Sequence, residues 1–324
     1  MRLGAARFGL IDIKEPTRPF KYPYAQGRFG FSGFLEASET MTSTLGALIE
    51  RAKGHPPTPT AVAHPCDAAS IAGAVDAALA GLIAPILIGP PGKIARAAAA
   101  AGVDIAPYPL VPTAHSHESA EKAVAVVREG RAEALMKGSL HTDELMHEVL
   151  RKEAGLRTER RLSHVFALDL KDSDRLYFVT DAAINIYPDL LTKADIVQNA
   201  IFCVTALGIE RPKVAILSAI ETVTPKIPST IDAAALCKMA ERGQITGGEI
   251  DGPLAFDNAV SVEAAAMKGI KSAVAGRADI LVAPDMEAGN MIAKQLIFLA
   301  GAEAAGVVMG ARVPIVLTSR ADDR

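Results

Sequence analysis

The stretch AEALMKGSLHTDELMHEVL, residues 132–150, decides the fold because a buried strand runs directly into a helix. Its apolar run ends at Met136, and after a short polar loop a helix begins with Asp143 and Glu144. Further strands are predicted at TAVAHP (60–65), PILIGP (85–90), KVAILSA (213–219), ADILVAP (278–284) and VPIVLTS (313–319). Helices are predicted at SAEKAVAVVREG (119–130), DLLTKADIVQNAIFCVTALG (189–208), IDAAALCKMAERG (231–243) and AGNMIAKQLIFLAG (288–301). This alternation predicts an α/β fold, a mainly parallel sheet with helices on both faces.

One segment departs from the alternation. LSHVFALDLKDSDRLYFVTD (162–181) contains two strands joined by a polar KDSD turn, which predicts a hairpin and antiparallel pairing. The polar, basic and glycine-led GLRTERR precedes it, so we place a domain boundary between Glu153 and Leu162. Farther along, ITGGEIDGPLAFDNAVS (245–261) predicts a strand that enters a loop.

Composition and charge narrow the class of partner. The 324 residues carry a formal net charge of −3 and half of them are hydrophobic. Mixed charges of this kind do not form the basic patch of a protein that binds nucleic acid or a membrane surface. No uninterrupted run of about 18 apolar residues is present to span a bilayer. We therefore expect a small-molecule partner. Cys66, Cys203 and Cys237 lack CxxC spacing, which indicates free thiols in a reducing cytoplasm.

Residues 1–40 differ from the rest of the chain. RPFKYPYAQGRFGFSGF (18–34) holds aromatic, glycine and basic residues without helical or strand periodicity, and it lacks the apolar core of a secretion signal. Alanine-rich, helix-like sequence begins only after Met41. We expect Met41 to be the natural start and residues 1–40 to be non-native upstream sequence. The alternative is an extension that packs on a partner subunit.

Two patterns that suggest a nucleotide or a metal are rejected. IGPPGKI (88–94) lacks the first glycine and the final hydroxyl of a phosphate-binding loop, so a strand-to-helix turn is the better interpretation. The histidines lack the further ligands that zinc needs. His115 and His117 lie in PTAHSHES, which indicates a loop, and His64 is isolated. We predict no metal site.

Cationic and hydroxyl-bearing residues separate the strand from the helix in the opening stretch. Lys137, Ser139, His141 and Thr142 surround the start of that helix, where backbone amides and the helix dipole favour an anion. The alternative is an ordinary helix capped by Thr142, which the two acidic residues that follow would suit. We favour a substrate anion at these four residues.

Two more groups of polar residues are candidates for substrate binding. Asp181 and Asn185 follow the hairpin and either bind a ligand at a strand end or cap local turns, and both interpretations stay open. Glu287, Asn290 and Lys294 fall at i, i+3 and i+7 of an otherwise apolar helix. We expect that stripe to face a cleft rather than bulk water.

Eight segments carry a more specific signal and follow one another over roughly residues 135–322. They are MKGSLHTDEL, GLRTERRLSHVF, FVTDAAINIYPDL, PKVAILSAIETV, IPSTIDAAALCKMAERGQI, DGPLAFDNAVS, SAVAGRADILVAPDMEAGNMIAKQL and VPIVLTSRAD. Together they resemble the phosphate acetyltransferase and phosphate butyryltransferase family, with the acetyltransferase favoured. Residues 41–133 resemble the family only in layout, and residues 1–40 do not resemble it.

The resemblance implies a fold similar to that of the isocitrate and isopropylmalate dehydrogenases. In that fold two α/β domains with mainly parallel sheets flank a cleft. Residues 41–153 and 308–324 would form the first domain, and residues 154–307 the second. The resemblance also implies a homodimer.

An activity is implied as well: acetyl-CoA plus phosphate gives acetyl phosphate plus CoA, reversibly and without a covalent enzyme intermediate. Coenzyme A, acetyl phosphate and inorganic phosphate are then the partners, and no cofactor is expected. Ser319 would donate a hydrogen bond to the oxyanion, and Arg320 would hold phosphate with two hydrogen bonds. The position of the family's carboxylate base falls beyond Arg324, so Asp322 is the nearest substitute. Arg157 would bind the acyl phosphate or the phosphates of CoA.

Three alternatives stay open. A phosphate butyryltransferase would differ in the depth of its acyl pocket. A metal-dependent NAD dehydrogenase of the same fold would use carboxylates such as Asp251, Asp257 and Asp285. A non-catalytic protein that senses CoA or an acyl phosphate would keep the pocket without turnover.

Overall fold

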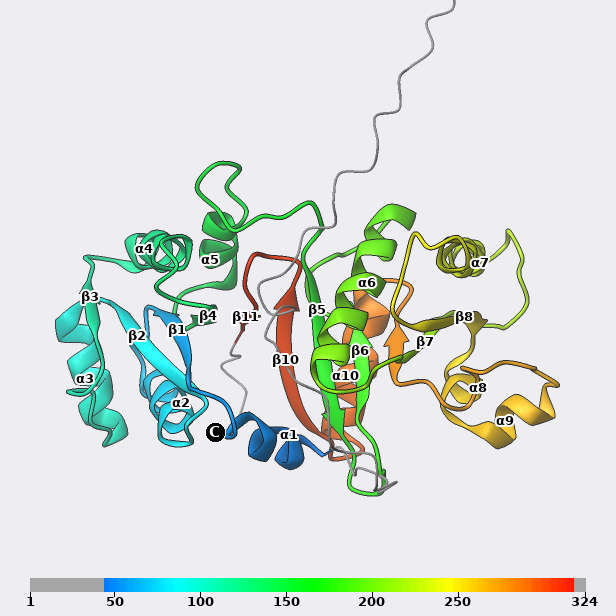
Figure 1. Ribbon diagram of the computed structural model, residues 1–324, viewed down its shortest axis with the longest axis horizontal. Helices are drawn as coiled ribbons and strands as arrows, with labels where there is room; N and C mark the ends of the chain where they lie inside the picture. The colour runs from blue at the N-terminus through cyan, green and yellow to red at the C-terminus, as the bar shows by residue number, and fades with distance from the viewer. Residues whose placement is uncertain (1–43, 318–324) are drawn as a thin grey trace, which may run out of the picture. The chain divides into compact units, whose positions relative to one another are not determined.

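Helices and strands alternate along residues 44–317, the part of the chain that the computed structural model describes (Figure 1). The elements of the first half are α1 (Leu45–Ala52), β1 (Thr58–Ala63), α2 (Ala68–Leu79), β2 (Ile83–Gly89), α3 (Pro91–Ala101), β3 (Leu110–Pro112), α4 (Ser116–Arg128), β4 (Ala134–Lys137) and α5 (Thr142–Val149). Those of the second half are β5 (Ser163–Asp169), β6 (Tyr177–Thr180), α6 (Leu190–Ala206), β7 (Lys213–Leu217), α7 (Pro228–Glu241), β8 (Glu249–Leu254), α8 (Phe256–Val260), α9 (Val262–Met267), β9 (Ile280–Val282), α10 (Met286–Phe298), β10 (Glu303–Met309) and β11 (Ile315–Val316). Our predictions for residues 1–40 and for Ser319, Arg320 and Asp322 fall outside the described residues and stay predictions.

The strands of residues 44–317 form one hydrogen-bonded sheet in the order β3-β2-β1-β4-β11-β10-β5-β6-β9-β7-β8. Seven of the ten neighbouring pairs are parallel, which confirms the predicted mainly parallel α/β sheet. The parallel pairs make two blocks. We call β3-β2-β1-β4-β11 the first block and β6-β9-β7-β8 the second block. The proposed division into two domains at residues 153 and 308 stays a prediction.

Three antiparallel steps join the two blocks, from β11 to β10, from β10 to β5 and from β5 to β6. Each antiparallel step reverses the strand direction, and three reversals leave the blocks running in opposite directions. The carboxyl ends of the first block therefore lie at one edge of the sheet, and those of the second block at the other.

The hairpin predicted at residues 162–181 is confirmed. β5 and β6 pair antiparallel, in a register that runs from Val165 opposite Thr180 to Leu168 opposite Tyr177. On its other side β5 pairs with β10, from Asp169 opposite Glu303 to Ser163 opposite Met309. β10 was not among the predicted strands, although it is central to the sheet.

Helices cover both faces of the first block because alternate strand residues point to opposite faces. Val62 and Leu87 pack with Ile71 of α2 and Ile94 of α3, whereas Ala61 packs with residues of α4 and α5 on the other face. Ile71, Leu87 and Ile94 are completely buried. Each such side chain stabilises the fold by about 1.5–3 kcal/mol. Figure 1 shows α4 and α5 on one side of these strands and α2 and α3 on the other.

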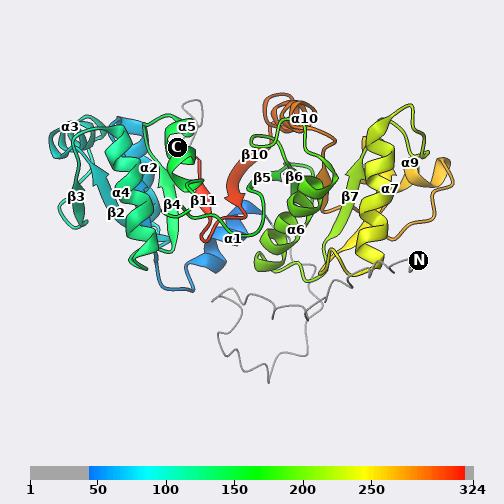
Figure 2. The same ribbon diagram turned by 90° about the horizontal axis from the view of Figure 1, so that it is seen from above.

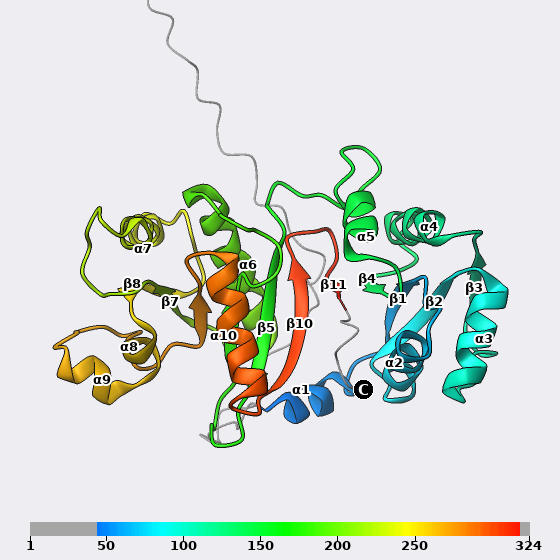
Figure 3. The same cartoon turned by 180° about the vertical axis from the view of Figure 1, so that it is seen from behind.

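The second block is covered in the same way. Ile216 and Val282 pack against α6 and α7, whereas Ala215 and Leu281 pack against α8, α9 and α10. Figure 2 shows α6 and α10 on opposite sides of β5 and β6, and Figure 3 shows α10 from the reverse side. Helices on both faces were predicted and are confirmed.

Two local predictions are wrong. The strand in residues 245–261 does not enter a loop, because β8 ends at Leu254 and α8 begins at Phe256. The stretch PTAHSHES is not simply a loop either. His115 is the N-cap of α4, and its Nδ1 accepts a hydrogen bond of 3.2 Å from the Glu118 amide. Within residues 44–317 no helix has the length and apolarity needed to cross a membrane.

Candidate functional site

The first block contains a topological switch point between β1 and β4. From β1 the chain passes through α2 to β2 on one side, and it later returns through α4 to β4 on the other side of β1. In open α/β sheets, ligands bind outside the carboxyl ends of the strands at such a point. The residues at the carboxyl ends of β1 and β4 and just after them therefore define the candidate site. They include the predicted Lys137, the last residue of β4, and Ser139.

The loop after β4 lies directly against the end of β1. The Gly138 amide donates to the Ala63 carbonyl at 2.8 Å, and the Ser139 amide donates to the His64 carbonyl at 2.9 Å. A Cβ on Gly138 would lie 2.6 Å from both of these carbonyl oxygens. No side chain fits at that distance, so glycine is required where the loop crosses β1.

The hydroxyl of Ser139 is engaged within the protein. Its Oγ donates to the His64 carbonyl at 2.8 Å and accepts from the Cys66 amide at 3.2 Å. Because this proton is already used, Ser139 shapes the loop rather than offering a free donor in this conformation. Its predicted direct contact with substrate stays a prediction.

Lys137 brings a buried positive charge to the same loop. The residue is 7% exposed, and its Nζ donates to the carbonyls of Gly138 at 3.1 Å and Leu140 at 3.3 Å. A buried ammonium at the carboxyl end of a strand makes the adjacent loop favourable for an anion. The structure thus places Lys137 at the end of β4, before the start of α5, and its predicted contact with substrate stays a prediction.

The helix that follows starts one residue earlier than the alternative interpretation assumed. His141 is the N-cap of α5 and Thr142 its first residue, and no side chain caps this helix. Thr142 as N-cap is therefore wrong. His141 and Thr142 are both exposed. An N-terminus without a side-chain cap leaves backbone amides for an anion.

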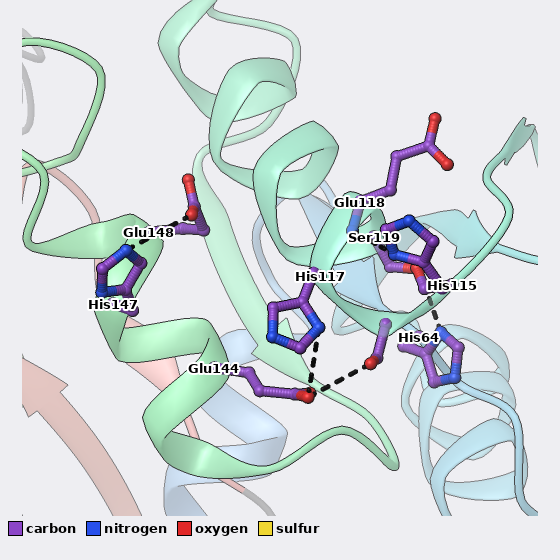
Figure 4. A network of polar contacts seen from close by, with 9 residues as sticks. His64, His115, His117, Glu118, Ser119, Glu144, His147 and Glu148 are labelled. Atoms are coloured by element: carbon purple, nitrogen blue, oxygen red, sulfur yellow. Dashed lines mark hydrogen bonds and ion pairs between the residues drawn. The ribbon is translucent and has the colours of Figure 1, made fainter.

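One of the two acidic residues in the first turn of this helix, Glu144, turns away from the helix start. The Oε1 atom of Glu144 accepts a hydrogen bond of 3.2 Å from the Ser116 hydroxyl. The same atom lies 3.4 Å from Nδ1 of His117 (Figure 4), and both partner residues are at the start of α4. The Glu144 carboxylate thus contacts the amino end of α4 rather than that of its own helix. This removes one expected competitor for an anion at α5.

His64 is a component of the site that the sequence analysis dismissed as isolated. It directly follows β1, is 7% exposed, and its Nδ1 lies 2.9 Å from the Ser119 hydroxyl (Figure 4). Burial, with a smaller effect of the Lys93 ammonium, lowers the pKa of His64. The nearby Cys66 thiol is protonated at neutral pH, because burial raises its pKa to about 11. The available signal was position alone, a polar residue directly after a buried strand.

Asp181 and Asn185 lie at the opposite edge of the sheet, after β6. The Asp181 carboxylate, 2% exposed, accepts five hydrogen bonds of 2.6–3.3 Å, four from backbone amides and one from the Asn185 side chain. The Asn185 amide also donates to the Leu162 carbonyl at 2.8 Å. Both side chains therefore hold the loop of residues 181–185. Their predicted contact with substrate stays a prediction.

Helix α10 packs closely on that loop. Asn290 donates to the Ala182 carbonyl at 3.1 Å, and a Cβ on Gly289 would lie 2.3 Å from the Asp181 carbonyl oxygen. Glu287 and Lys294, of the same predicted stripe, are exposed. The structure thus brings Asp181, Asn185 and Asn290 together.

The remaining predicted residues divide between the two edges. Arg157 is exposed and forms an isolated bridge with Ala311, beyond the carboxyl end of β10 and on the edge where Asp181 lies. At the other edge, β11 pairs in parallel with β4, and Val316 lies opposite Met136. The chain beyond β11 carries the predicted Ser319 and Arg320 outside the described residues. Across residues 44–317 no three His, Cys, Asp or Glu side chains gather as a metal site would need.

The comparisons with known proteins point in one direction. Residues 111–324 match a family model with the description phosphate acetyl/butaryl transferase. The phosphate acetyltransferase of Rhizobium meliloti is 63% identical over 280 residues, which cover 86% of this chain and 89% of that protein. The phosphate butyryltransferase of Clostridium acetobutylicum is 42% identical over 282 residues, which cover 87% of this chain and 94% of that protein.

Solved structures support the same architecture. A phosphotransacetylase from Streptococcus pyogenes superposes with a TM-score of 0.74 at 22% identity, covering 87% of this chain and 94% of that one. A 4-hydroxythreonine-4-phosphate dehydrogenase from Klebsiella pneumoniae superposes with a TM-score of 0.50 at 13% identity, covering 82% and 91%. At these identities the likeness concerns the fold, and it agrees with the predicted similarity to dehydrogenases.

Proposed function

Because the chain belongs to the phosphate acetyl/butyryl transferase family, a family of acyltransferases, we propose that it transfers an acetyl group reversibly between coenzyme A and inorganic phosphate. Acetyl-CoA and phosphate give acetyl phosphate and CoA. The bond between the carbonyl carbon and sulfur breaks, a bond from the same carbon to a phosphate oxygen forms, and the thiolate leaves and takes up a proton. Identity of 63% to an acetyltransferase, against 42% to a butyryltransferase, favours acetyl as the group transferred.

One observation supports the place of this reaction most directly. The segment Lys137–Ser139 begins at the last residue of β4, at the switch point, and β11 runs parallel beside β4 toward the same edge. A buried ammonium and a helix start without a side-chain cap would hold the phosphate there. Residues beyond β11 would then reach the same place from the adjacent strand.

The chemistry assigns roles to those residues in the proposal. Ser319 would donate to the oxyanion that forms when phosphate or thiolate attacks the carbonyl carbon. Arg320 would hold the phosphate through two parallel hydrogen bonds, which a lysine cannot reproduce. Asp322 would accept the proton released by the attacking group. No covalent enzyme intermediate and no cofactor are needed for this direct attack.

The finer expectations belong to the same proposal. We place the enzyme in the cytoplasm, supported by cysteines that are free thiols in the described part of the chain. We also propose a homodimer. The large apolar side chains of Tyr187, Leu191 and Met291 are 75%, 70% and 67% exposed. Burial of these side chains against a second copy of the chain would remove their apolar surface from water.

Phosphate butyryltransferase activity is the second candidate, favoured by the relative from Clostridium acetobutylicum. The two candidates differ in the acyl chain that the pocket accepts. Relative kcat/KM for acetyl phosphate and butyryl phosphate separates them, because each extra methylene in a matching pocket changes binding by about 1 kcal/mol.

The decisive experiment follows CoA-dependent thioester formation from acetyl phosphate and from butyryl phosphate. It compares the full chain with Arg320→Ala and with the control Arg324→Ala. We expect turnover that prefers acetyl phosphate, falls at least about 100-fold in Arg320→Ala and is kept in the control. Folded protein without turnover on either substrate would overturn the proposal and leave a sensing protein or a dehydrogenase. Full activity in Arg320→Ala would overturn the role of Arg320 alone.

A further inference from the structure

We propose that His64 is a positioning residue of this enzyme, whose carbonyl and ring together fix the loop of residues 137–141 at the start of α5. The inference rests on the proposed function, because it concerns the site that would hold phosphate. It assigns no contact between His64 and substrate.

The backbone of His64 adopts an unfavourable conformation. Its φ is 56°, and it is the one non-glycine residue with positive φ within residues 44–317. A non-glycine residue in this region costs roughly 1–2 kcal/mol and persists where the surrounding structure requires it. The conformation therefore has a local cause.

That cause is the carbonyl group. The His64 oxygen accepts three hydrogen bonds, from the Cys66 amide at 2.8 Å, the Ser139 amide at 2.9 Å and the Ser139 hydroxyl at 2.8 Å. The same turn places the Ala63 carbonyl 2.8 Å from the Gly138 amide. The end of β1 thus holds two successive residues of the loop that leads to α5.

The ring of His64 anchors this turn to helix α4. Ser119 Oγ lies 2.9 Å from His64 Nδ1, 2.8 Å from Thr113 Oγ1 and 2.9 Å from the His115 carbonyl oxygen. A hydroxyl has one proton and two acceptor sites, and a carbonyl only accepts. Ser119 therefore donates to His115 and accepts from the other two, so the His64 proton is on Nδ1.

The two halves of the residue thus act as one connection. The ring is fixed by Ser119, the fixed residue keeps its left-handed backbone, and the backbone carbonyl holds Ser139. Removal of the ring frees the turn to relax, which shifts the loop and the amides at the start of α5. A shift of about 1 Å in groups that hold a substrate can cost about 100-fold in rate.

Three substitutions at His64 separate these effects. His64→Ala removes the ring donor and keeps a residue that disfavours positive φ. His64→Asn keeps a short donor for Ser119 and tolerates the left-handed conformation. His64→Gly tolerates the conformation but lacks the donor. His147→Ala, on the exposed side of α5, is the matched control because its side chain is 78% exposed.

We expect KM for phosphate to rise about tenfold in His64→Ala and His64→Gly, to return to within about threefold of wild type in His64→Asn, and to stay unchanged in the control. Ser119→Ala, in which His64 itself is not substituted, should also raise KM for phosphate because the ring loses its partner. A merely structural role would lower the melting temperature and leave KM for phosphate unaltered.

The outcomes distinguish this inference from the proposed function. An inactive wild-type enzyme overturns both. An active wild type with KM for phosphate within twofold in His64→Ala and Ser119→Ala overturns the positioning role alone. If His64→Ala does not fold, Ser119→Ala and His64→Asn decide by the same criterion. A raised KM in Ser119→Ala together with rescue in His64→Asn supports the inference.

Discussion

In both blocks, hydrogen bonds hold the loop that follows a strand end. The two blocks differ in which polar groups remain available beside that loop. After β6 in the second block, both carboxylate oxygens of the buried Asp181 accept hydrogen bonds from the residues of its own loop. After β1 and β4 in the first block, backbone carbonyls hold the loop instead, and Lys137 and the start of α5 stay beside it. In both places a glycine lets backbones meet, Gly138 in one and Gly289 in the other. A buried polar side chain at a strand end is therefore weak evidence for a ligand site. Stronger evidence comes from groups that lie beside the loop but are not needed to hold it, such as the start of α5, which has no side-chain cap.

Of the substitutions considered, Gly138→Ala should reduce activity most, because it displaces the loop after β4 in the first block. The added Cβ would lie 2.6 Å from two backbone oxygens, so the loop must move away from β1. We expect kcat/KM to fall by at least about 100-fold, because the anion-binding groups move with the loop. Gly73→Ala is the control, since no atom lies within 4 Å of its Cβ and the residue is in helix α2. Wild-type kcat/KM in Gly138→Ala would contradict the assignment of this loop.

Asp181→Asn should lower the stability of the protein, because it weakens the loop after β6 in the second block. An amide nitrogen would replace one acceptor oxygen among five donors, which leaves buried N–H groups without an acceptor. We expect the free energy of unfolding to fall by roughly 2–4 kcal/mol in urea titration. Asp172→Asn, an exposed position in the hairpin turn, should change it by less than about 0.5 kcal/mol. Equal stability of both variants would refute the structural role of Asp181.

Ser139→Ala tests the first block more gently. The substitution removes the hydroxyl that bonds the His64 carbonyl and accepts from the Cys66 amide, but it keeps the backbone bond to His64. We expect kcat/KM to fall about tenfold and the free energy of unfolding to change by about 1 kcal/mol. Steady-state kinetics and urea unfolding measure the two. A loss of stability without any loss of activity would mean that the Ser139 hydroxyl has only a structural role, like the Asp181 carboxylate after β6.

The helix caps should show the smallest effects and no difference between blocks. Asp67 caps α2 after β1, and Asp285 caps α10 after β9, each with a hydrogen bond of 2.8 Å to an amide three residues on. Replacement of either by Ala should cost about 1 kcal/mol of unfolding free energy, and replacement by Asn should cost less. Thermal denaturation of the four variants checks this. A much larger effect at one cap would mean that its carboxylate has a further role.

The secondary structure was predictable where local sequence determines it. The hairpin at residues 162–181 follows from two apolar runs and a polar turn. β10 escaped prediction because its start, Glu303–Gly306, consists of a charged residue and small side chains that indicate no periodicity. Its strand identity comes from pairing with β5 along seven residues. Such pairing is a tertiary property.

The candidate site was predictable in its parts but not in its arrangement. Lys137 and Ser139 were found because small and cationic residues follow an apolar strand. Lys137 and Ser139 lie at the opposite edge of the sheet from Asp181 and Asn185, because three antiparallel strand pairings reverse the strand direction between the two blocks. No local sequence pattern encodes the number of such pairings. His64 was missed because its role depends on one φ angle and on Ser119, which is 55 residues away in the chain.

The place of β11 also determines when the sheet can be completed during synthesis. Ile315 pairs with Leu135, so the strand beside β4 is among the last parts of residues 44–317 to be made. The neighbouring β10 is made only shortly before it. Until then one edge of β4 has no partner, and unpaired strand edges promote association between chains. On the nascent chain this edge of β4 therefore stays open to association with other chains until residues beyond 315 have left the ribosome.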